Sequence, residues 1–278
     1  TLGPFSVATT ERIAMILDIA YTQHQGTDWR YPVQQDALWN SVEVIQSRNL
    51  HPAGLQTQAD VVSLAVADGL GGTPHAERAS RTVLEELAAA IQGGVTFDKG
   101  LVRRIHGRLC DRLAFGETIG SATTLAAVKI QGEQCSVMNV GDSRVYRLSS
   151  QGEWQQLSRD HTVLNGMIAR GEAEEGEEYA TVYNTLDSCL AADSEDADFD
   201  IHQCAAPFLP GDALLLCTDG VHDTLDRASL QQLIVPGTSA LAQAQILRKA
   251  VLRAGAPDNF SLIFCQSQSS SNRPFFAP

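Results

Sequence analysis

Short apolar runs divide the chain into candidate strands, and several of them end in a turn that contains glycine and aspartate. Residues 61–67 are rich in Val, Leu and Ala and stop at Asp68, while residues 213–218 stop at Asp219, and a glycine follows each aspartate. Branched apolar runs of this length are typical of buried strands. Further strands are predicted over residues 12–21, 120–130, 134–140, 145–148, 154–157, 201–204 and 260–265.

Apolar residues at helical spacing alternate with these strands. One helix is predicted from Pro74 to the glycine pair at Gly93 and Gly94, because Pro is tolerated in a first helical turn and glycines end a helix. Three more helices are expected, at residues 97–114, 161–170 and 239–254. The chain therefore mixes both kinds of element along its whole length.

Residues 120–148 hold three candidate strands in succession. Strands this close in sequence predict an antiparallel meander, with a hairpin turn at residues 141–144, which read Gly-Asp-Ser-Arg. Asp142 and Arg144 are interpreted as structural residues of that turn. Residues 172–200 are acidic and weakly patterned, which predicts a long exposed loop or lid.

Charge and cysteine content narrow the partners and the compartment. With 20 Lys and Arg against 33 Asp and Glu, the net charge is -13, which disfavours nucleic acid and anionic membranes as partners. The six cysteines form no Cys-x-x-Cys pair, so a reducing, cytoplasmic location is expected. No apolar run approaches the roughly 20 residues that span a bilayer.

Four aspartates share one kind of position, the junction between a strand and a turn. They are Asp36, Asp68, Asp219 and Asp258. Burying several carboxylates together is prohibitive unless cations neutralise them. Ligands that are all oxygen favour Mg²⁺ or Mn²⁺ over Zn²⁺. The sequence alone does not show whether the four side chains lie close together in the fold.

Five motifs, in order, give the chain a family resemblance. They are residues 66–72 (VADGLGG), 120–124 (GSATT), 139–144 (NVGDSR), 216–220 (LCTDG) and the pair Asp258-Asn259. Together they resemble the metal-dependent Ser/Thr protein phosphatases of the type 2C (PPM) class. Eukaryotic members carry a histidine at the position of Leu70, so in this respect the chain resembles the bacterial branch of the class. The resemblance covers about residues 13–265.

The resemblance implies an α+β fold with four layers, in which two packed antiparallel sheets are flanked by helices. It also implies a single catalytic domain at residues 1–265, with the acidic lid at about 172–200 and a polar tail at 266–278. The implied activity is hydrolysis of phosphoserine and phosphothreonine by a hydroxide that bridges two Mn²⁺ or Mg²⁺ ions. The implied partners are phosphorylated proteins, the substrates of a Ser/Thr kinase, and a monomer is expected.

Metal ligands follow from the same resemblance. Asp68 would bridge two ions, the Gly69 carbonyl would bind one of them, Asp219 and Asp258 would complete the other, and Asp36 would bind metal or orient its water. Asn259 would support Asp258. Some bacterial members use a third ion held by an acidic residue three positions before the Gly-Ser/Thr motif, and Glu117 stands there.

Two departures from the family pattern bear on the substrate. Tyr31 stands where relatives have an arginine that clamps the phosphate, so the neighbouring Arg30 is the candidate clamp. The lid reads LDSCLA at residues 186–191 where relatives read LTRALG, and its acidic flank suggests basic phosphopeptides as substrates. An alternative remains a weak or inactive relative that binds phosphoproteins without hydrolysing them. A structural protein with incidental Asp-Gly turns is the third option.

Overall fold

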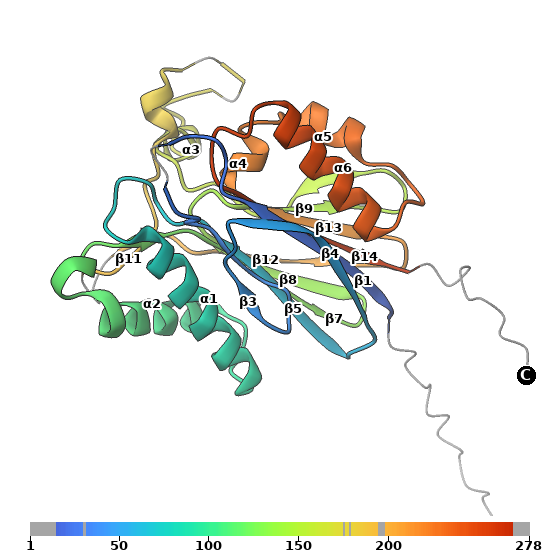
Figure 1. The fold of residues 1–278 in the computed structure, drawn as a ribbon, viewed down its shortest axis with the longest axis horizontal. Helices are drawn as coiled ribbons and strands as arrows, with labels where there is room; N and C mark the ends of the chain where they lie inside the picture. The colour runs from blue at the N-terminus through green and yellow to red at the C-terminus, as the bar shows by residue number, and fades with distance from the viewer. Residues whose placement is uncertain (1–14, 30–31, 175, 178, 194–197, 269–278) are drawn as a thin grey trace, which may run out of the picture.

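Two six-stranded antiparallel sheets are stacked on each other, with helices on both outer faces (Figure 1). The computed structural model describes residues 15–29, 32–174, 176–177, 179–193 and 198–268. The predicted tail at 266–278 therefore lies almost wholly outside the described residues. Across the described part of the chain, no helix is long and apolar enough to cross a membrane.

The first sheet, sheet 1, contains the first and the last strand of the fold as neighbours. Its order is β10 (Trp154–Gln156), β9 (Arg144–Leu148), β13 (Ala213–Cys217), β14 (Phe260–Ser267), β1 (Leu17–His24) and β4 (Asn49–Thr57).

Sheet 2 packs against it. Its order is β12 (His202–Pro207), β8 (Gln134–Val140), β7 (Leu125–Gln131), β5 (Val61–Ala67), β2 (Ala37–Trp39) and β3 (Val44–Ile45). A two-stranded sheet of β6 (Ala122–Thr123) and β11 (Leu190–Ala191) lies beside it.

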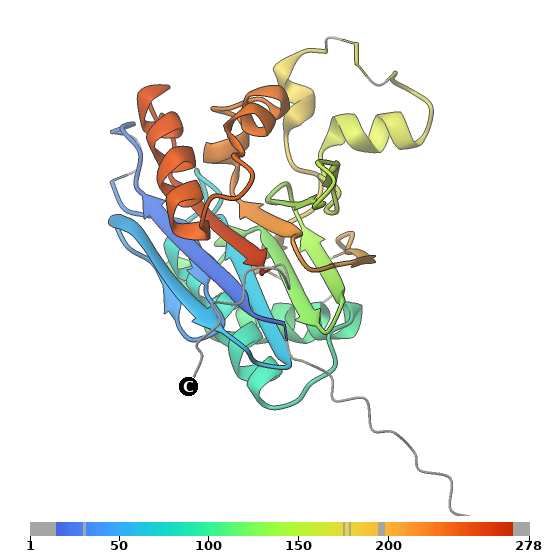
Figure 2. The same cartoon turned by 90° about the vertical axis from the view of Figure 1, so that its right-hand side faces the viewer.

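Three apolar clusters hold the layers together. The central cluster fills the space between the sheets and includes Leu64 and Ile263. The second joins sheet 2 to α1 (Ala76–Gln92) and α2 (Lys99–Leu113), and the third joins sheet 1 to α5 (Arg227–Leu233) and α6 (Ala240–Arg253). Figure 2 shows the helix pairs on opposite sides of the sheets. The predicted four-layer α+β architecture is confirmed.

Helix starts follow ordinary capping chemistry. The side chains of Asp98 and Ser239 accept hydrogen bonds from backbone N–H groups in the first turns of α2 and α6. Thr162 does the same for α3 (Val163–Ala169). These helices were expected, whereas α5, the single-turn α4 (Asp219–His222) and the 3₁₀ turns η1 (Gly116–Thr118) and η2 (Thr181–Asn184) were not.

The prediction of a first strand at residues 12–21 is wrong in its bounds. Strand β1 begins at Leu17 and continues through Thr22, Gln23 and His24, where a loop was expected. Polar residues fit inside this strand because their side chains have partners: the Thr22 hydroxyl donates to the Leu50 carbonyl at 2.6 Å. Residues 12–14 lie outside the described residues.

The predicted meander is confirmed for its first two strands and is wrong for the third. Strands β7 and β8 pair in sheet 2, but β9 pairs with β10 and β13 in sheet 1. Residues 141–143 therefore carry the chain from one sheet to the other and form no hairpin. Gly141 has φ +88° there, and a Cβ on it would lie 2.6 Å from the Thr124 methyl carbon.

Candidate active site

The register of the strands brings the four predicted aspartates to one end of the sandwich. Asp36 precedes β2 and Asp68 follows β5, and the pairing of Ala37 with Ala67 sets the two aspartates side by side in sheet 2. Asp219 starts α4 directly after β13, and Asp258 lies just before the neighbouring strand β14 in sheet 1. Each sheet thus contributes two carboxylates.

A hydrogen bond joins the two halves of the site. The Thr218 hydroxyl, from sheet 1, donates to Asp36 Oδ2 in sheet 2 at 2.9 Å. The other oxygen, Asp36 Oδ1, is buried and has no hydrogen-bond partner. A buried carboxylate oxygen without a donor carries a large desolvation cost, which a bound cation would offset.

The carboxylates also disfavour one another's charge. Burial, and then the charge of Asp219, raises the pKa of Asp36 to about 8. The same two causes raise the pKa of Asp258 to about 6. Burial and the charges of Asp219 and Asp36 lift the pKa of Asp68 well above its usual range. Mutual repulsion of this kind shows that the four groups lie close together, as a cation site requires.

Asp142 is a fifth carboxylate of this group. It was not among the predicted site residues, because it was interpreted as a structural residue of a hairpin turn. It lines the same cavity, and burial together with the charge of Asp219 raises its pKa to about 7. The signal was present, because Asp142 follows the buried strand β8 as Asp68 follows β5.

Two histidines hold the segment that carries Asp142. The backbone N–H of Gly141 donates to His161 Nδ1 at 3.0 Å. His222 Nε2 lies 3.1 Å from the Asp142 carbonyl oxygen. The contact of His161 therefore positions Gly141, the residue next to the Asp142 carboxylate.

Backbone contacts fix Asp68 and Asp258. The N–H of Asp68 donates to the Thr124 hydroxyl, and the Thr123 hydroxyl donates to the Asp68 carbonyl. Asn259 Oδ1 accepts from the Gln35 N–H at 2.6 Å. Asn259 thereby ties the strand end at Asp258 to the residue before Asp36.

Glycines are required where these segments approach one another. A Cβ on Gly69 would lie 2.5 Å from the Ala76 carbonyl oxygen, at the start of α1. A Cβ on Gly220 would lie 2.0 Å from the Asn259 carbonyl oxygen. Neither position can accept a side chain without a shift of backbone.

A cavity of about 400 Å³ opens above the carboxylates. The segment 184–189 also lines this cavity, and it belongs to the acidic stretch expected to form a lid. Its lining includes Asp68, Gly69, Asp142, Asp219 and Asp258, together with Gln35, Thr124, Asp187, Cys189 and Asn259.

The donor set fits a hard divalent cation, although it is not a finished ligand shell. Within the described residues, no three His, Cys, Asp or Glu side chains already converge tightly enough to hold one ion. The nearby groups are all oxygen donors, as Mg²⁺ and Mn²⁺ prefer, and both ions usually keep several waters. A bound ion of this kind would neutralise the gathered carboxylates and would give the unpartnered Asp36 Oδ1 a ligand bond.

Of the predicted site residues that the structure describes, Glu117 is the one that is not brought into the site. Glu117 lies exposed in η1 and is not part of the cavity lining. Arg30, the candidate phosphate clamp, and its neighbour Tyr31 lie outside the described residues.

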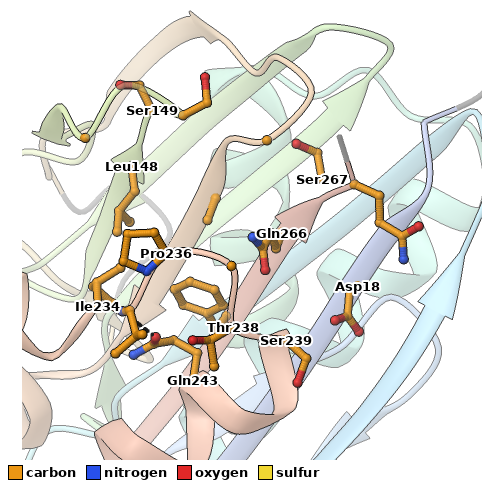
Figure 3. A pocket seen from close by; sticks show the side chains of 18 of the residues that line it. Asp18, Leu148, Ser149, Ile234, Pro236, Thr238, Ser239, Gln243, Gln266 and Ser267 are labelled. Carbon is orange, nitrogen blue, oxygen red and sulfur yellow. Dashed lines mark hydrogen bonds between the residues drawn. The ribbon is translucent and has the colours of Figure 1, made fainter. Parts of the chain in front are cut away.

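A larger cavity, of about 810 Å³, lies on the outer face of sheet 1 (Figure 3). Ile234 and Pro236, from the connection between α5 and α6, line it opposite Asp18 and Ser267. Its lining contains none of the five clustered carboxylates, so its size does not make it the candidate active site.

Comparison with solved structures identifies the fold. The crystal structure of the catalytic domain of the serine threonine protein phosphatase PstP, in complex with two manganese ions, superposes with a TM-score of 0.69 at 23% identity. The match covers 92% of this chain and 100% of that domain. At this identity the likeness shows the fold alone.

Sequence comparison identifies the family. The model of the protein phosphatase 2C family matches residues 51–254, and the chain belongs to that family. It is 29% identical over 208 residues to the serine/threonine protein phosphatase PstP of Mycobacterium tuberculosis. It is 24% identical over 211 residues to the serine/threonine phosphatase Stp of Listeria innocua.

The two relatives differ in length. Each alignment covers 72% of this chain, but it spans 39% of the mycobacterial protein and 82% of the Listeria protein.

Proposed function

We propose that the protein is a metal-dependent phosphatase that hydrolyses phosphoserine and phosphothreonine in proteins. The observation that carries this proposal is the gathering of carboxylates from both sheets around Asp219, one of which, Asp36, has a buried oxygen without a hydrogen-bond partner. Membership of the phosphatase 2C family supports it.

Two Mn²⁺ or Mg²⁺ ions would be held by Asp36, Asp68, Asp219, Asp258 and the Gly69 carbonyl. When bound, such ions lower the pKa of a water molecule and neutralise charge on the phosphoryl oxygens. A third ion at Glu117 gains no support from that residue's exposed position outside the cavity.

The neighbouring residues of the protein hold the carboxylates of the site in position. Thr218 orients Asp36, and Thr123 and Thr124 fix the backbone of Asp68. Asn259 keeps the segments of Asp258 and Asp36 together. The segment 184–189 lines the cavity together with the carboxylates and would limit water access around a bound phosphopeptide.

The wider setting of the protein is part of the same proposal. Its substrates would be proteins phosphorylated by a Ser/Thr kinase. Residues 1–265 would form one monomeric catalytic domain with a lid at about 172–200. A reducing location such as the cytoplasm belongs to the same proposal, which the absence of any Cys-x-x-Cys pair in the sequence motivates.

The decisive experiment is phosphate release from a phosphothreonine peptide. We expect release with Mn²⁺, none with EDTA, and a loss of more than about a hundredfold in the Asp219→Asn variant. An exposed carboxylate distant from the site, as in Asp111→Asn, serves as the matched control and should leave the rate unchanged.

A phosphoprotein-binding regulator is the second candidate. The observation that favours it is that no Lys or Arg lines the cavity among the described residues. Binding of the phosphopeptide with Mn²⁺ but without any phosphate release from the wild-type protein would reject the enzyme and select the regulator.

A further inference from the structure

Trp29 is the most exposed large apolar side chain among the described residues. Its exposed fraction is 88%, against 69% for Val42, the next in order. It lies on the connection between β1 and β2. Figure 1 shows the start of this connection at the same end of the sandwich as α4. Isolated exposed apolar residues are common on protein surfaces, so exposure alone assigns no role to Trp29.

The backbone beside Trp29 is fixed to the segment that carries Asp258. The Thr27 N–H donates to the Ala256 carbonyl at 2.9 Å, and the Asp28 N–H donates to the Pro257 carbonyl at 3.2 Å. Gly26 packs against the Asp258 backbone so closely that a Cβ would lie 2.2 Å from its carbonyl oxygen.

The other end of the connection is fixed to the same place. Gln35 lines the cavity, and its N–H donates to the Asn259 side chain. Because neighbouring Cα atoms are about 3.8 Å apart, Trp29 stands one residue from a backbone contact with Pro257. The backbone next to Trp29 is therefore fixed beside the candidate active site, and the indole is exposed to solvent.

The charge around the rim of the cavity is negative. Two acidic side chains that are not proposed to hold metal contribute to it. Asp187 lines the cavity and is exposed. Asp223, whose side chain is 75% exposed, lies near enough for its charge to raise the pKa of Asp258. No Lys or Arg of the described residues lines the cavity, so little in its walls attracts an acidic peptide.

An exposed indole in a negative field is a binding surface for a cation. An arginine or lysine over the face of a Trp ring gains about 0.5–2 kcal/mol, and arginine is the commoner partner. Tryptophan is also enriched among the residues that dominate protein interfaces. Both facts apply to a peptide that lies across the rim with its phosphate in the cavity.

We propose that Trp29 is a specificity-determining residue of this site, on which an arginine or lysine flanking the phosphorylated residue of the substrate stacks. The inference rests on the proposed phosphatase function and names its substrate class: phosphoproteins with a basic residue close to the phosphorylated serine or threonine. The ring contacts the flanking residue and takes no part in the chemistry at phosphorus.

The test uses phosphothreonine peptides that differ only in flanking residues, which are Arg, Ala or Glu, and p-nitrophenyl phosphate as a substrate without flanks. For the wild-type protein we expect kcat/KM to be about tenfold higher for the Arg peptide than for the Ala peptide, and lowest for the Glu peptide.

Trp29→Ala should lower kcat/KM for the Arg peptide about tenfold through KM, with little change for the Ala peptide. Hydrolysis of p-nitrophenyl phosphate should be unchanged. Trp29→Phe should retain part of the preference, and Val42→Ala, which removes another exposed apolar side chain, should retain all of it.

Two results would overturn the inference. One is a wild-type protein that does not prefer the Arg peptide, and the other is a preference that survives in Trp29→Ala. Equilibrium binding of the same peptides with Mn²⁺ separates this failure from that of the proposed function. If no substrate is hydrolysed, an Arg-peptide Kd that rises about tenfold in Trp29→Ala still supports the inference, and an unchanged Kd rejects it.

Discussion

Asp36 shows how the environment of one side chain determines its chemistry. One of its oxygens accepts a hydrogen bond from Thr218, while the other is buried beside further carboxylates without a donor. Nothing within the described part of the chain neutralises this group when it is ionised, so the metal-free protein has two ways to relieve the cost: it can bind a proton or a cation.

The stability of the metal-free protein should therefore fall as the pH rises. Asp36 and Asp142 have folded-state pKa values of about 8 and about 7, above the ordinary value of an aspartate. The folded protein holds these protons more tightly than the unfolded chain, so their stabilisation is complete below the ordinary pKa and is lost as pH rises through these values. Thermal melts in EDTA between about pH 5.5 and 8.5 measure it.

Mn²⁺ should make that decline smaller, because the ion replaces the protons on the carboxylates. Asp36→Asn, which removes one titrating group, should give a shallower slope in EDTA. A metal-free melting temperature that increases over this pH range would contradict the assignment of these raised pKa values.

Asp212 is a buried carboxylate that, unlike Asp36, has both a cationic partner and backbone donors. Arg147 donates to it at 2.7 Å, and the N–H groups of Ser150 and Leu209 also donate to it. Asp212→Ala should cost about 3–5 kcal/mol of unfolding free energy, because it leaves the Arg147 charge buried without a partner. Chemical denaturation measures the loss.

Asp111→Ala is the matched control for Asp212→Ala. Asp111 pairs with Arg108 at 3.2 Å, but both side chains are more than half exposed. Such surface pairs contribute about 0–1 kcal/mol. Equal losses in the two variants would mean that burial does not distinguish the two ion pairs.

Among the secondary-structure elements, the site depends on the turns that follow the strands, because these turns pack closely against one another. Gly220, in the first turn of α4, lies against the Asn259 carbonyl oxygen, so the loop before β14 leaves no space for a methyl group. The distance between the ends of β13 and β14 is therefore part of the active-site geometry.

Gly220→Ala should lower activity by more than about a hundredfold, since a shift of about 1 Å in positioned groups is enough for such a loss. Phosphate release with Mn²⁺ is the measurement. Gly107→Ala is the control, because Gly107 lies within α2, where an added Cβ would meet no neighbouring side chain or element within 4 Å. It should keep full activity and gain about 0.5–1 kcal/mol of stability.

Elements with strong local signals were predictable from sequence. The apolar runs of β5 and β13 and the amphipathic helix α1 lie where expected. Strand β4 was missed, because it is an exposed edge strand of mixed polarity. The turn at residues 141–143 was misread, since a hairpin and a crossing between two sheets use the same glycine-containing sequence and only the packing partners differ.

The same limit applies to the site. Asp68 and Asp219 follow buried strands, and this local pattern is visible in the sequence. Convergence depends on which strands pair, which no local pattern records, so Asp142 was left out and Glu117 was included. The lining of the cavity includes Asp142 and does not include Glu117.

The candidate site joins the two sheets, which also pack against each other through the central apolar cluster. Asp36 and Asp68 belong to sheet 2, and Asp219 and Asp258 to sheet 1. A cation bound by both pairs would link the two layers directly, in addition to the contacts of the central cluster.

Mn²⁺ should therefore raise the melting temperature of the protein. Binding to the folded state alone adds about 2.7 kcal/mol at a hundred times the Kd. Differential scanning calorimetry with and without Mn²⁺ measures the effect, and Asp68→Asn together with Asp219→Asn should abolish it. An identical melting temperature at saturating Mn²⁺ would contradict a site shared by both sheets.

The pairing of the first and last strands has a consequence for synthesis on the ribosome. Strand β1 pairs with β14 along its whole length, from Leu17 with Ser267 to His24 with Phe260. Sheet 1 lacks its central strand until β14 has left the exit tunnel, and Asp258 emerges just before it. A nascent chain therefore cannot assemble the carboxylate cluster before Asp258 and β14 have been synthesised. The candidate active site can form only after translation has passed these residues.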